Sequence, residues 1–246
     1  MTGIYPEAII LAGGKGTRLR SVLADRPKPM AILGGKPFLE WILLMLRRQG
    51  VQRAVICTGH LSEIVESYFG DGKDIGMQIT FARDPFPLGT GGAVRNALGR
   101  TKTKHILVLN GDSYLRIDLS GFLKAHFAVN ARTSLSLVQV EDSSRYGSVK
   151  INKDGKVMAF LEKLQKKEAG LINAGIYLIE RNIVKEIPEG RTISLEREVF
   201  PNLIGKGLYG VPCKSPFIDI GIPESFNNAE KILKSEFEYL AQQVNL

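Results

Sequence analysis

The stretch "AIILAGGKGTRLRSVLADRPKPM", residues 8–30, joins a short apolar run to a loop rich in glycine and positive charge. Short apolar runs that end at glycine are typical of buried strands. Three glycines within four positions follow, and their backbone N–H groups can approach an oxyanion because no side chain obstructs them. Arg18 then offers a planar fork and Lys28 a mobile point charge for phosphate oxygens. The stretch predicts a strand that ends in a phosphate-binding loop, with an ordinary glycine-rich turn as the alternative.

Two common phosphate-binding motifs do not fit this loop. A P-loop requires Gly-Lys followed by Ser or Thr at the end of G-x-x-x-x-G-K-[ST], and the loop has no such triplet. A dinucleotide fingerprint requires G-x-G-x-x-G, and Leu19 stands where the third glycine should allow a helix to pack closely on a strand. The loop therefore predicts neither a Walker A site nor an NAD site.

Further apolar runs alternate with helical patterns in the first half of the chain. The runs are 53–59, 77–82 and 105–112, and the helical patterns are 37–50, 61–70 and 91–99. Such alternation predicts right-handed βαβ units, and so an α/β fold with a Rossmann-like mixed, mainly parallel sheet flanked by helices. Ligands bind these sheets at the carboxyl ends of the strands, where both the glycine loop and "NGDSY" at 110–114 fall.

The pattern changes after residue 132, where "SLSLVQV" and "LINAGIYLIE" favour strands and Lys-Asp-Gly at 153–155 favours a hairpin turn. We therefore expect a smaller antiparallel lobe in the second half. Since no Pro/Ser-rich linker separates the halves, we interpret the chain as one domain. Its expected parts are a first lobe at 1–132, a second lobe at 133–222 and an amphipathic C-terminal helix at 223–246 that packs on its own core in preference to a dimer surface.

Composition narrows the class of protein. A chain of 246 residues with 44% hydrophobic content can bury a substantial core, and it has no run of about 18 apolar residues. We expect a globular protein of the cytoplasm with no membrane contact. The formal net charge of +8 comes from scattered Lys and Arg, without the interleaved aromatics of a nucleic-acid-binding stripe. Cys57 and Cys213 stand in apolar runs and are interpreted as inert core thiols.

The opening loop resembles the signature of the sugar-1-phosphate nucleotidylyltransferases, G-x-G-T-R-L followed by P-K-P-M, and further motifs match in order along nearly the whole chain. These enzymes join a nucleoside triphosphate to a sugar 1-phosphate and release pyrophosphate. "RLRSVLADRPKPMA" and "LGTGGAV" resemble the branch of the D-glycero-alpha-D-manno-heptose 1-phosphate guanylyltransferases. The resemblance implies transfer from GTP to that heptose phosphate, for synthesis of a bacterial capsule or lipopolysaccharide.

Other activities stay open at this point. Within the family they are guanylyl transfer to mannose 1-phosphate, and uridylyl or thymidylyl transfer to N-acetylmuramate or glucose 1-phosphate. A nucleotide-sugar sensor without turnover is an alternative of another class. A sensor would be expected to lose Arg18, Lys28 or a metal carboxylate, and all of these are present. A homo-oligomer is also left open.

The resemblance implies where the substrates and Mg²⁺ bind. Asp112 in "LVLNGDSY" and Asp219 in "FIDIGIPES" match the family's metal-binding aspartates. Lys163 would bind the sugar phosphate, whereas Arg18 and Lys28 would stabilise the departing pyrophosphate. The implied nucleotide site comprises Leu11, Ala12, Gly13, Gly14, Gly16, Thr17, Asp84 and Gly89, and the implied sugar site comprises Gly147, Glu162, Asn173 and Gly175.

The choice of base depends on Asp84, which the resemblance places beside the base together with Gly89. Guanine presents adjacent N1–H and N2–H₂ donors, and one carboxylate can accept from both, whereas uracil and thymine offer a single N–H between two carbonyls. Asp84 therefore favours guanine. An aspartate before proline is also an ordinary turn residue, so that interpretation stays open.

Overall fold

The computed structural model describes residues 5–14, 26–144, 146–161, 167–221, 225–226 and 229–230. The strands are β1 (Glu7–Leu11), β2 (Ile32–Leu33), β3 (Lys36–Pro37), β4 (Arg53–Thr58), β5 (Gln78–Arg83), β6 (His105–Asn110), β7 (Ser113–Leu115), β8 (Thr133–Val140), β9 (Ser148–Ile151), β10 (Val157–Leu161), β11 (Gly170–Glu180), β12 (Leu208–Pro212) and β13 (Phe217–Asp219). The helices are α1 (Phe38–Arg48), α2 (Ser62–Phe69), α3 (Gly89–Ala97), α4 (Leu119–Ala128), α5 (Arg181–Lys185) and α6 (Phe200–Asn202), with short 3-10 turns η2 (Lys28–Met30), η3 (Lys73–Ile75) and η4 (Leu98–Arg100) and a π-helical turn η5 (Leu195–Val199).

A parallel array forms one half of the central sheet. Strand β1 pairs in parallel with β4 on one side and β6 on the other, and β4 pairs in parallel with β5. These are the four strands that the apolar runs predict, and α1, α2 and α3 lie where the helical patterns predict them. The predicted mixed, mainly parallel sheet is therefore confirmed.

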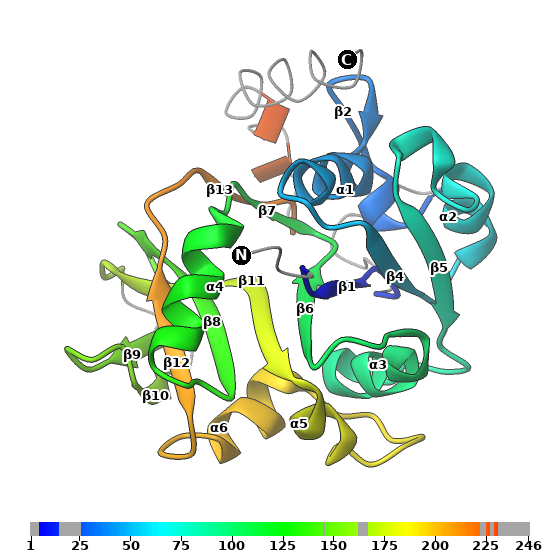
Figure 1. Cartoon of the computed structure of the whole chain (residues 1–246). Coiled ribbons are helices and arrows are strands. Elements are labelled where there is room, and N and C mark those ends of the chain that lie inside the picture. Colours follow the sequence, from blue (N-terminus) through cyan, green and yellow to red (C-terminus); the bar gives the residue numbers. More distant parts are fainter. Residues whose placement is uncertain are drawn as a thin grey trace.

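Helices cover both faces of this array, with α1 and α2 on one face and α3 and α5 on the other (Figure 1). Successive side chains of a strand point to opposite faces, so neighbours in β1 enter different cores. Ile10 packs with Trp41 of α1, whereas Ile9 packs with Val94 of α3. Both faces are apolar, which explains why the strands appear in the sequence as continuous apolar runs rather than alternating ones.

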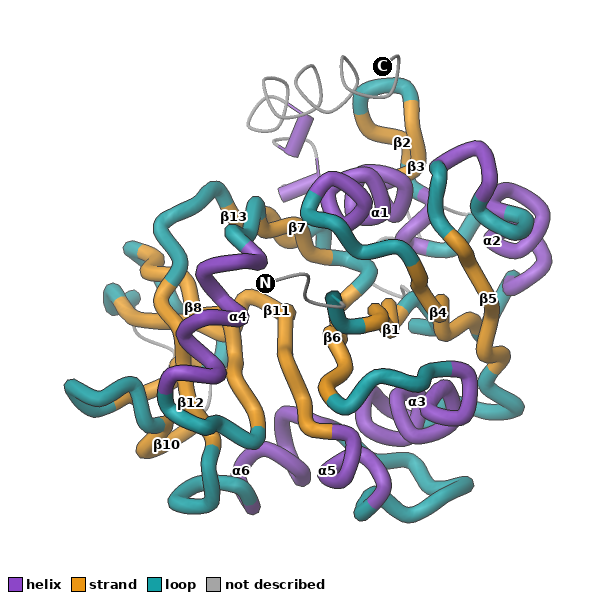
Figure 2. The backbone as a smooth tube through the Cα atoms, viewed as in Figure 1, coloured by secondary structure: helices purple, strands orange, loops and turns teal. Residues whose placement is uncertain are grey.

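Strand β11 joins the parallel half to the antiparallel half. It pairs antiparallel with β6 through Ile176–Glu180, with β8 through both Gly170–Asn173 and Tyr177–Ile179, and with β9 at Ile172. Strands β8, β9, β10 and β12 thus continue the same nine-stranded sheet, as the tube in Figure 2 shows. The second half is mainly antiparallel as predicted, but β12 pairs in parallel with β8, and no break in the sheet separates these strands from the first half.

The turn at 153–155 is the hairpin between β9 and β10 that Lys-Asp-Gly predicts. Gly155 has φ of +78°, a left-handed conformation that glycine adopts without strain. The Asn152 Oδ1 atom accepts from the Asp154 and Lys156 backbone N–H groups at 3.0 and 2.9 Å, so the turn is closed by a side chain as well.

Most of the predicted C-terminal helix at 223–246 lies outside the described residues. Within the part of the chain that the structure describes, no helix has the length and apolar character needed to cross a membrane.

Candidate active site

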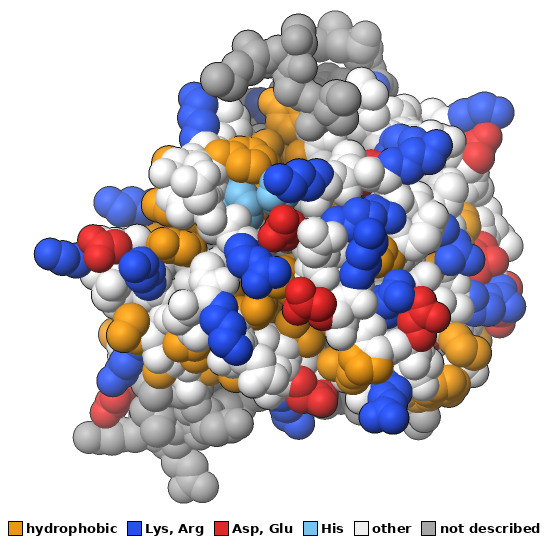
Figure 3. All heavy atoms as spheres, turned by 60° about the horizontal axis from the view of Figure 1, so that its bottom comes forward, with side chains coloured by type: hydrophobic (Ala, Val, Ile, Leu, Met, Phe, Trp, Pro, Cys, Tyr) orange, Lys and Arg blue, Asp and Glu red, His pale blue; other side chains and the backbone are white. Residues whose placement is uncertain are grey.

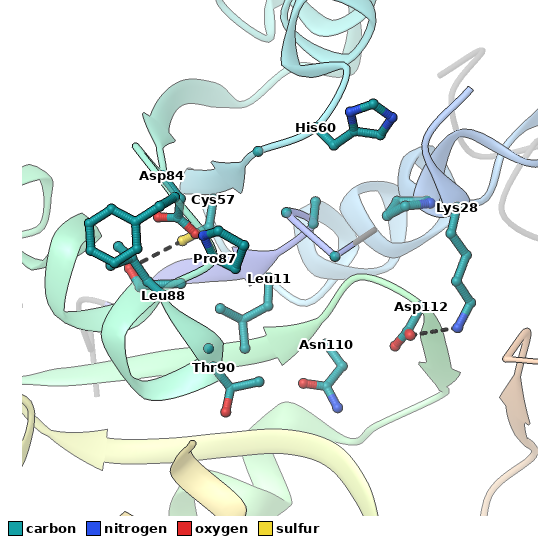
Figure 4. Close-up of a pocket in the computed structure, with 18 of the residues that line it drawn as sticks. Leu11, Lys28, Cys57, His60, Asp84, Pro87, Leu88, Thr90, Asn110 and Asp112 are labelled. Atoms are coloured by element: carbon teal, nitrogen blue, oxygen red, sulfur yellow. Dashed lines mark hydrogen bonds and ion pairs between the residues drawn. The ribbon is translucent and has the colours of Figure 1, made fainter. Parts of the chain in front are cut away.

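A pocket of about 710 Å³ opens at the carboxyl ends of β1, β4 and β6, beside the start of α3 (Figure 4). This is the edge of the sheet where the topology predicts a ligand. Its described lining residues are Leu11, Ala12, Gly13, Gly14, Lys28, Pro29, Cys57, Gly59, His60, Asp84, Pro85, Phe86, Pro87, Leu88, Gly89, Thr90, Ala93, Asn110, Asp112 and Gly221. The described part of the predicted nucleotide site, from Leu11 to Gly14 with Asp84 and Gly89, lines this one pocket.

Close backbone packing holds the strand ends under the glycine loop. The Ala12 N–H donates to the Cys57 carbonyl at 3.0 Å, and the Gly111 N–H donates to the Leu11 carbonyl at 2.9 Å. A Cβ added at Gly111 would lie 2.8 Å from the Leu11 carbonyl oxygen, which is too close for a side chain. By contrast, a Cβ at Gly14 would meet no described atom within 4 Å. Gly111 is therefore closely packed against the end of β1, whereas Gly14 lines the pocket with no described atom in the space of a side chain.

Asp84 lies at one end of the pocket, next to Pro87 (Figure 4). Its Oδ1 atom accepts from the Asn96 side-chain amide at 3.0 Å, and its backbone N–H donates to the Thr58 carbonyl at 2.8 Å. Burial raises the pKa of Asp84 above its ordinary value, and the hydrogen bond from Asn96 acts in the opposite direction. The carboxyl is thus fixed in direction and retains acceptor capacity for a ligand.

Charged groups gather at the other end of the pocket. The Lys28 Nζ atom lies 2.6 Å from Asp112 Oδ2 and 3.9 Å from Asp219 Oδ1. The small antiparallel sheet of β7 and β13 brings these distant aspartates together, because Asp219 pairs with Ser113 and the Ile220 N–H donates to the Asp112 carbonyl at 3.1 Å. The three predicted residues form one cluster.

This cluster fits a cation that is shared with phosphates. Asp112 and Asp219 both reach the Lys28 ammonium, so two carboxylates converge on one positive charge. Mg²⁺ is bound in proteins by one or two carboxylates together with waters and substrate phosphates, rather than by a full protein cage. Among the described residues, no group of three His, Cys, Asp or Glu side chains could hold a metal ion.

The predicted sugar-side residues lie on and beside β11. The Asn173 Oδ1 atom accepts from the Gly175 N–H at 3.0 Å, within an irregular stretch of the pairing with β8. A Cβ at Gly175 would lie 2.7 Å from the Asn110 side-chain nitrogen, so this glycine makes room for a pocket residue. Gly147 is exposed just before β9. Their contact with a sugar stays a prediction.

Five predicted site residues lie outside the described residues, so their predicted roles stay predictions. They are Gly16, Thr17, Arg18, Glu162 and Lys163.

The glycine run that opens α3 has a packing role that the sequence did not reveal. Gly89 has φ of +69°, and a Cβ there would lie 2.5 Å from the Ile193 carbonyl oxygen. A Cβ at Gly92 would lie 2.4 Å from the Arg191 carbonyl oxygen. The Gly91 N–H donates to the Ile193 carbonyl at 2.8 Å. These glycines therefore admit the backbone of 191–193 against the start of α3.

A hydrogen-bonded group behind the pocket was also missed. It comprises Thr90, Asn173, Tyr177, Ser194 and Glu196, which come from α3, β11, the N-cap of η5 and η5 itself. Only Asn173 was singled out from the sequence. The others lack a local pattern, because they meet through tertiary structure; the Gly-Thr-Gly-Gly run was the one signal that a second segment approaches α3.

The cysteines are free and do not supply a reactive thiolate. Cys57 is buried at the pocket, and burial raises the pKa of its thiol far above the ordinary value. Burial also raises the pKa of Cys213. Both thiols are therefore protonated at neutral pH, in agreement with their interpretation as inert.

Charged side chains of both signs lie on the surface of the protein. Figure 3 shows basic and acidic side chains interspersed over the face that it presents. This arrangement matches the scattered charge of the sequence.

Known proteins are similar to this chain over most of its length. The family described as nucleotidyl transferase matches residues 7–236. The chain is 38% identical to the D-glycero-alpha-D-manno-heptose 1-phosphate guanylyltransferase of Aneurinibacillus thermoaerophilus, over 93% of this chain and 98% of that protein. It is 40% identical to a mannose-1-phosphate guanylyltransferase of Mycobacterium tuberculosis over 89% of its own length, but spans 62% of that relative.

A solved structure agrees as well. HddC from Yersinia pseudotuberculosis, in its crystal structure complexed with GMP-PN, has a TM-score of 0.81 and 34% sequence identity, covering 92% of this chain and 99% of that one. The predicted resemblance is confirmed by these matches, which extend over most of the chain. The chain belongs to the nucleotidyl transferase family.

Proposed function

We propose that this protein transfers a guanylyl group from GTP to a sugar 1-phosphate, with D-glycero-alpha-D-manno-heptose 1-phosphate as the favoured acceptor. The observation that carries the proposal is the polarity of one pocket. Asp84 at one end suits guanine, and Lys28 and Asp112 at the other end, with Asp219 beside Lys28, suit phosphate and a cation. Gly13 and Gly14, which begin the glycine loop, line the same pocket and offer backbone N–H groups to a triphosphate.

The relatives support the choice of substrates. The heptose 1-phosphate guanylyltransferase is matched over 98% of its length, and HddC, whose structure holds GMP-PN, over 99%. Mannose 1-phosphate is the second candidate, because the mycobacterial mannose-1-phosphate guanylyltransferase is 40% identical. Both candidates use a guanine nucleotide, so the base is better supported than the sugar. Since GTP is a cytoplasmic substrate, we propose the cytoplasm as the compartment.

The proposed reaction is an in-line displacement. An oxygen of the sugar phosphate forms a bond to the α-phosphorus of GTP, the bond from that phosphorus to the bridging oxygen breaks, and pyrophosphate leaves with the electron pair. The attacking phosphate is already anionic near neutral pH, so no strong general base is needed. Positioning and electrostatic stabilisation supply the rate. Once the Lys28 ammonium leaves Asp112, it is placed to neutralise the departing pyrophosphate. Arg18 and Lys163 keep their predicted roles.

Asp112 and Asp219 would hold Mg²⁺ in this scheme. The bound ion would polarise phosphoryl oxygens and offset their charge. The β7–β13 pairing holds the two aspartates so that both carboxylates face the position of the Lys28 ammonium.

The test of the reaction is pyrophosphate release with Mg²⁺, crossing five nucleoside triphosphates with heptose, mannose, glucose and N-acetylmuramate 1-phosphates. We expect release with GTP and the heptose phosphate. Release with mannose 1-phosphate alone would make mannose 1-phosphate the acceptor in place of the heptose phosphate. Release with UTP or dTTP would refute the assignment of the base. Silence across all pairs would refute the enzyme and favour a nucleotide-sugar sensor.

The role of Asp84 has a sharper test in inosine triphosphate, which lacks the exocyclic N2–H₂ group of guanine. The wild type should prefer GTP to ITP by about 10-fold or more in kcat/KM, because one donor to the carboxylate is lost. Asp84→Asn should reduce that preference. A preference that is unchanged in the variant would remove Asp84 from base recognition.

A further inference from the structure

Glu196 is the centre of the hydrogen-bonded group behind the pocket. Its Oε2 atom accepts from the Thr90 hydroxyl at 2.7 Å and from the Ser194 hydroxyl at 3.0 Å. Its Oε1 atom accepts from the Tyr177 hydroxyl at 3.0 Å. One carboxylate therefore holds three hydroxyl groups, from α3, β11 and the segment before η5. π-Helical turns such as η5 are frequent at functional sites.

The charge of Glu196 determines the direction of each hydroxyl. An ionised carboxylate can only accept, so the hydroxyl protons of Thr90 and Tyr177 must both point at it. Tyr177 is fully buried, and burial followed by the Glu196 charge raises its pKa well above the ordinary value. The phenol stays protonated at neutral pH and remains a donor to Glu196.

Because the hydroxyl protons of Thr90 and Tyr177 point at Glu196, the remaining lone pairs of this group are acceptors. The Thr90 oxygen donates to Glu196 and accepts from the Leu195 N–H at 2.8 Å, which leaves one lone pair. The Tyr177 oxygen accepts from the amide of Asn173 at 2.8 Å. The side-chain nitrogen of Asn110 faces β11, 2.7 Å from where a Cβ of Gly175 would stand, so the Asn110 carbonyl oxygen is the atom left for a ligand.

Thr90 and Asn110 both line the pocket, whereas Glu196 and Tyr177 do not. Figure 4 shows Thr90 and Asn110 beside one another along one wall, between the end that holds Asp84 and the end that holds Asp112. Two neighbouring acceptors between a base site and a phosphate site suit hydroxyl donors, and in a nucleotide sugar these groups belong to sugar rings. A purely structural cluster would not need to present its free acceptors to the cavity.

We infer that Glu196 is a positioning residue that fixes Thr90 as an acceptor for sugar hydroxyl groups in the middle of the pocket, where Asn110 offers a second acceptor. The inference rests on the proposed function. The hydroxyls belong either to the ribose of the nucleotide or to the sugar 1-phosphate. Glu196 itself does not touch the substrate.

Glu196→Gln tests the inference, since the amide keeps the volume but turns one acceptor into a donor and frees Thr90 or Tyr177 to rotate. Glu198→Gln is the matched control, because Glu198 lies on the same turn and is exposed, and its side chain accepts from the Ser194 N–H, which a glutamine oxygen can still do. Binding is measured by calorimetry with the nucleotide that the wild type binds, its 2′- and 3′-deoxy forms, and the sugar phosphate with its deoxy analogues.

We expect the wild type and Glu198→Gln to bind one hydroxylated ligand about 10-fold more tightly than its deoxy form, and Glu196→Gln to bind both forms alike. Lost discrimination in the nucleotide series identifies the ribose, and lost discrimination in the sugar series identifies the acceptor. Discrimination that is equal in Glu196→Gln and the wild type in both series would overturn the inference.

Tyr177→Phe and Thr90→Val keep the test decisive if Glu196→Gln does not fold. Each removes one arm, so each should lose part of the same discrimination, and retention of full discrimination by both would overturn the inference. Binding is read without turnover. A wild type that binds but releases no pyrophosphate would therefore refute the proposed function and leave this inference to be judged separately.

Discussion

The two glycine-rich turns of this molecule differ in what fills the space that a side chain would take. At Gly14, in the loop after β1, a Cβ would meet no described atom within 4 Å. At Gly92, in the run that opens α3, a Cβ would lie 2.4 Å from the Arg191 carbonyl oxygen. At Gly14, which lines the pocket, no described atom fills this space, whereas at Gly92 the backbone of another segment fills it. Glycine in a sequence marks a close approach without saying which partner approaches.

The comparison predicts that changes facing the open turn affect turnover, whereas changes at the filled turn affect stability. The largest effect is expected at the charged end of the open pocket. Asp112→Asn should lower kcat by about 1000-fold, because it removes a predicted cation ligand and the partner of Lys28. The free energy of unfolding should change little, since Asp112 is partly exposed.

The measurements are pyrophosphate release and thermal unfolding. Asp74→Asn is the control, because Asp74 is exposed in η3 and lies outside the pocket. A folded Asp112→Asn variant with near wild-type turnover would break the assignment of this end of the pocket to phosphate transfer.

The next effect is on stability, at the filled turn. Gly92→Ala should lower the free energy of unfolding by about 2–3 kcal/mol, because the new methyl group overlaps the Arg191 carbonyl in a closely packed site. Gly99→Ala is the matched control, since a Cβ there meets no described atom within 4 Å, and it should be neutral or slightly stabilising. Urea unfolding measures both. Equal stability of the two variants would show that the filled turn tolerates a side chain.

This contrast also separates what the sequence could predict from what it could not. The parallel strands and the open loop follow from apolar runs that end at glycine, and this signal is local. The pairing of Asp112 with Asp219 was implied only by the family resemblance, because β7 and β13 are short and distant in sequence. Glu196 and Tyr177 were missed because neither has a local pattern; they acquire their roles only when 191–193 packs on α3.

A smaller effect is expected at the open turn itself. Gly14→Ala should leave the free energy of unfolding within about 0.5 kcal/mol of the wild type, because the methyl group meets nothing in the described protein. It should raise the KM for the nucleoside triphosphate by about 10-fold, since the methyl group would stand where phosphate oxygens approach the backbone N–H groups. Steady-state kinetics and urea unfolding measure the two quantities. A lower stability with an unchanged KM would make this turn equivalent to the filled one.

The smallest effect concerns Asp84, which lines the pocket at the end proposed to hold the base. Burial raises its pKa above the ordinary 3.8, so the folded protein holds this proton more readily than the unfolded chain does. The resulting contribution to stability is fully present below pH 3.8 and is lost as the pH rises through the raised pKa. At pH 7 the buried carboxylate therefore costs stability, and Asp84→Asn should be more stable than the wild type, by no more than about 0.5 kcal/mol.

Urea unfolding at pH 7 and pH 4 checks this, with Asp74→Asn as the exposed control. A gain that grows toward pH 4 would contradict the raised pKa, because the advantage of the neutral amide must shrink as the wild-type carboxyl takes up its proton.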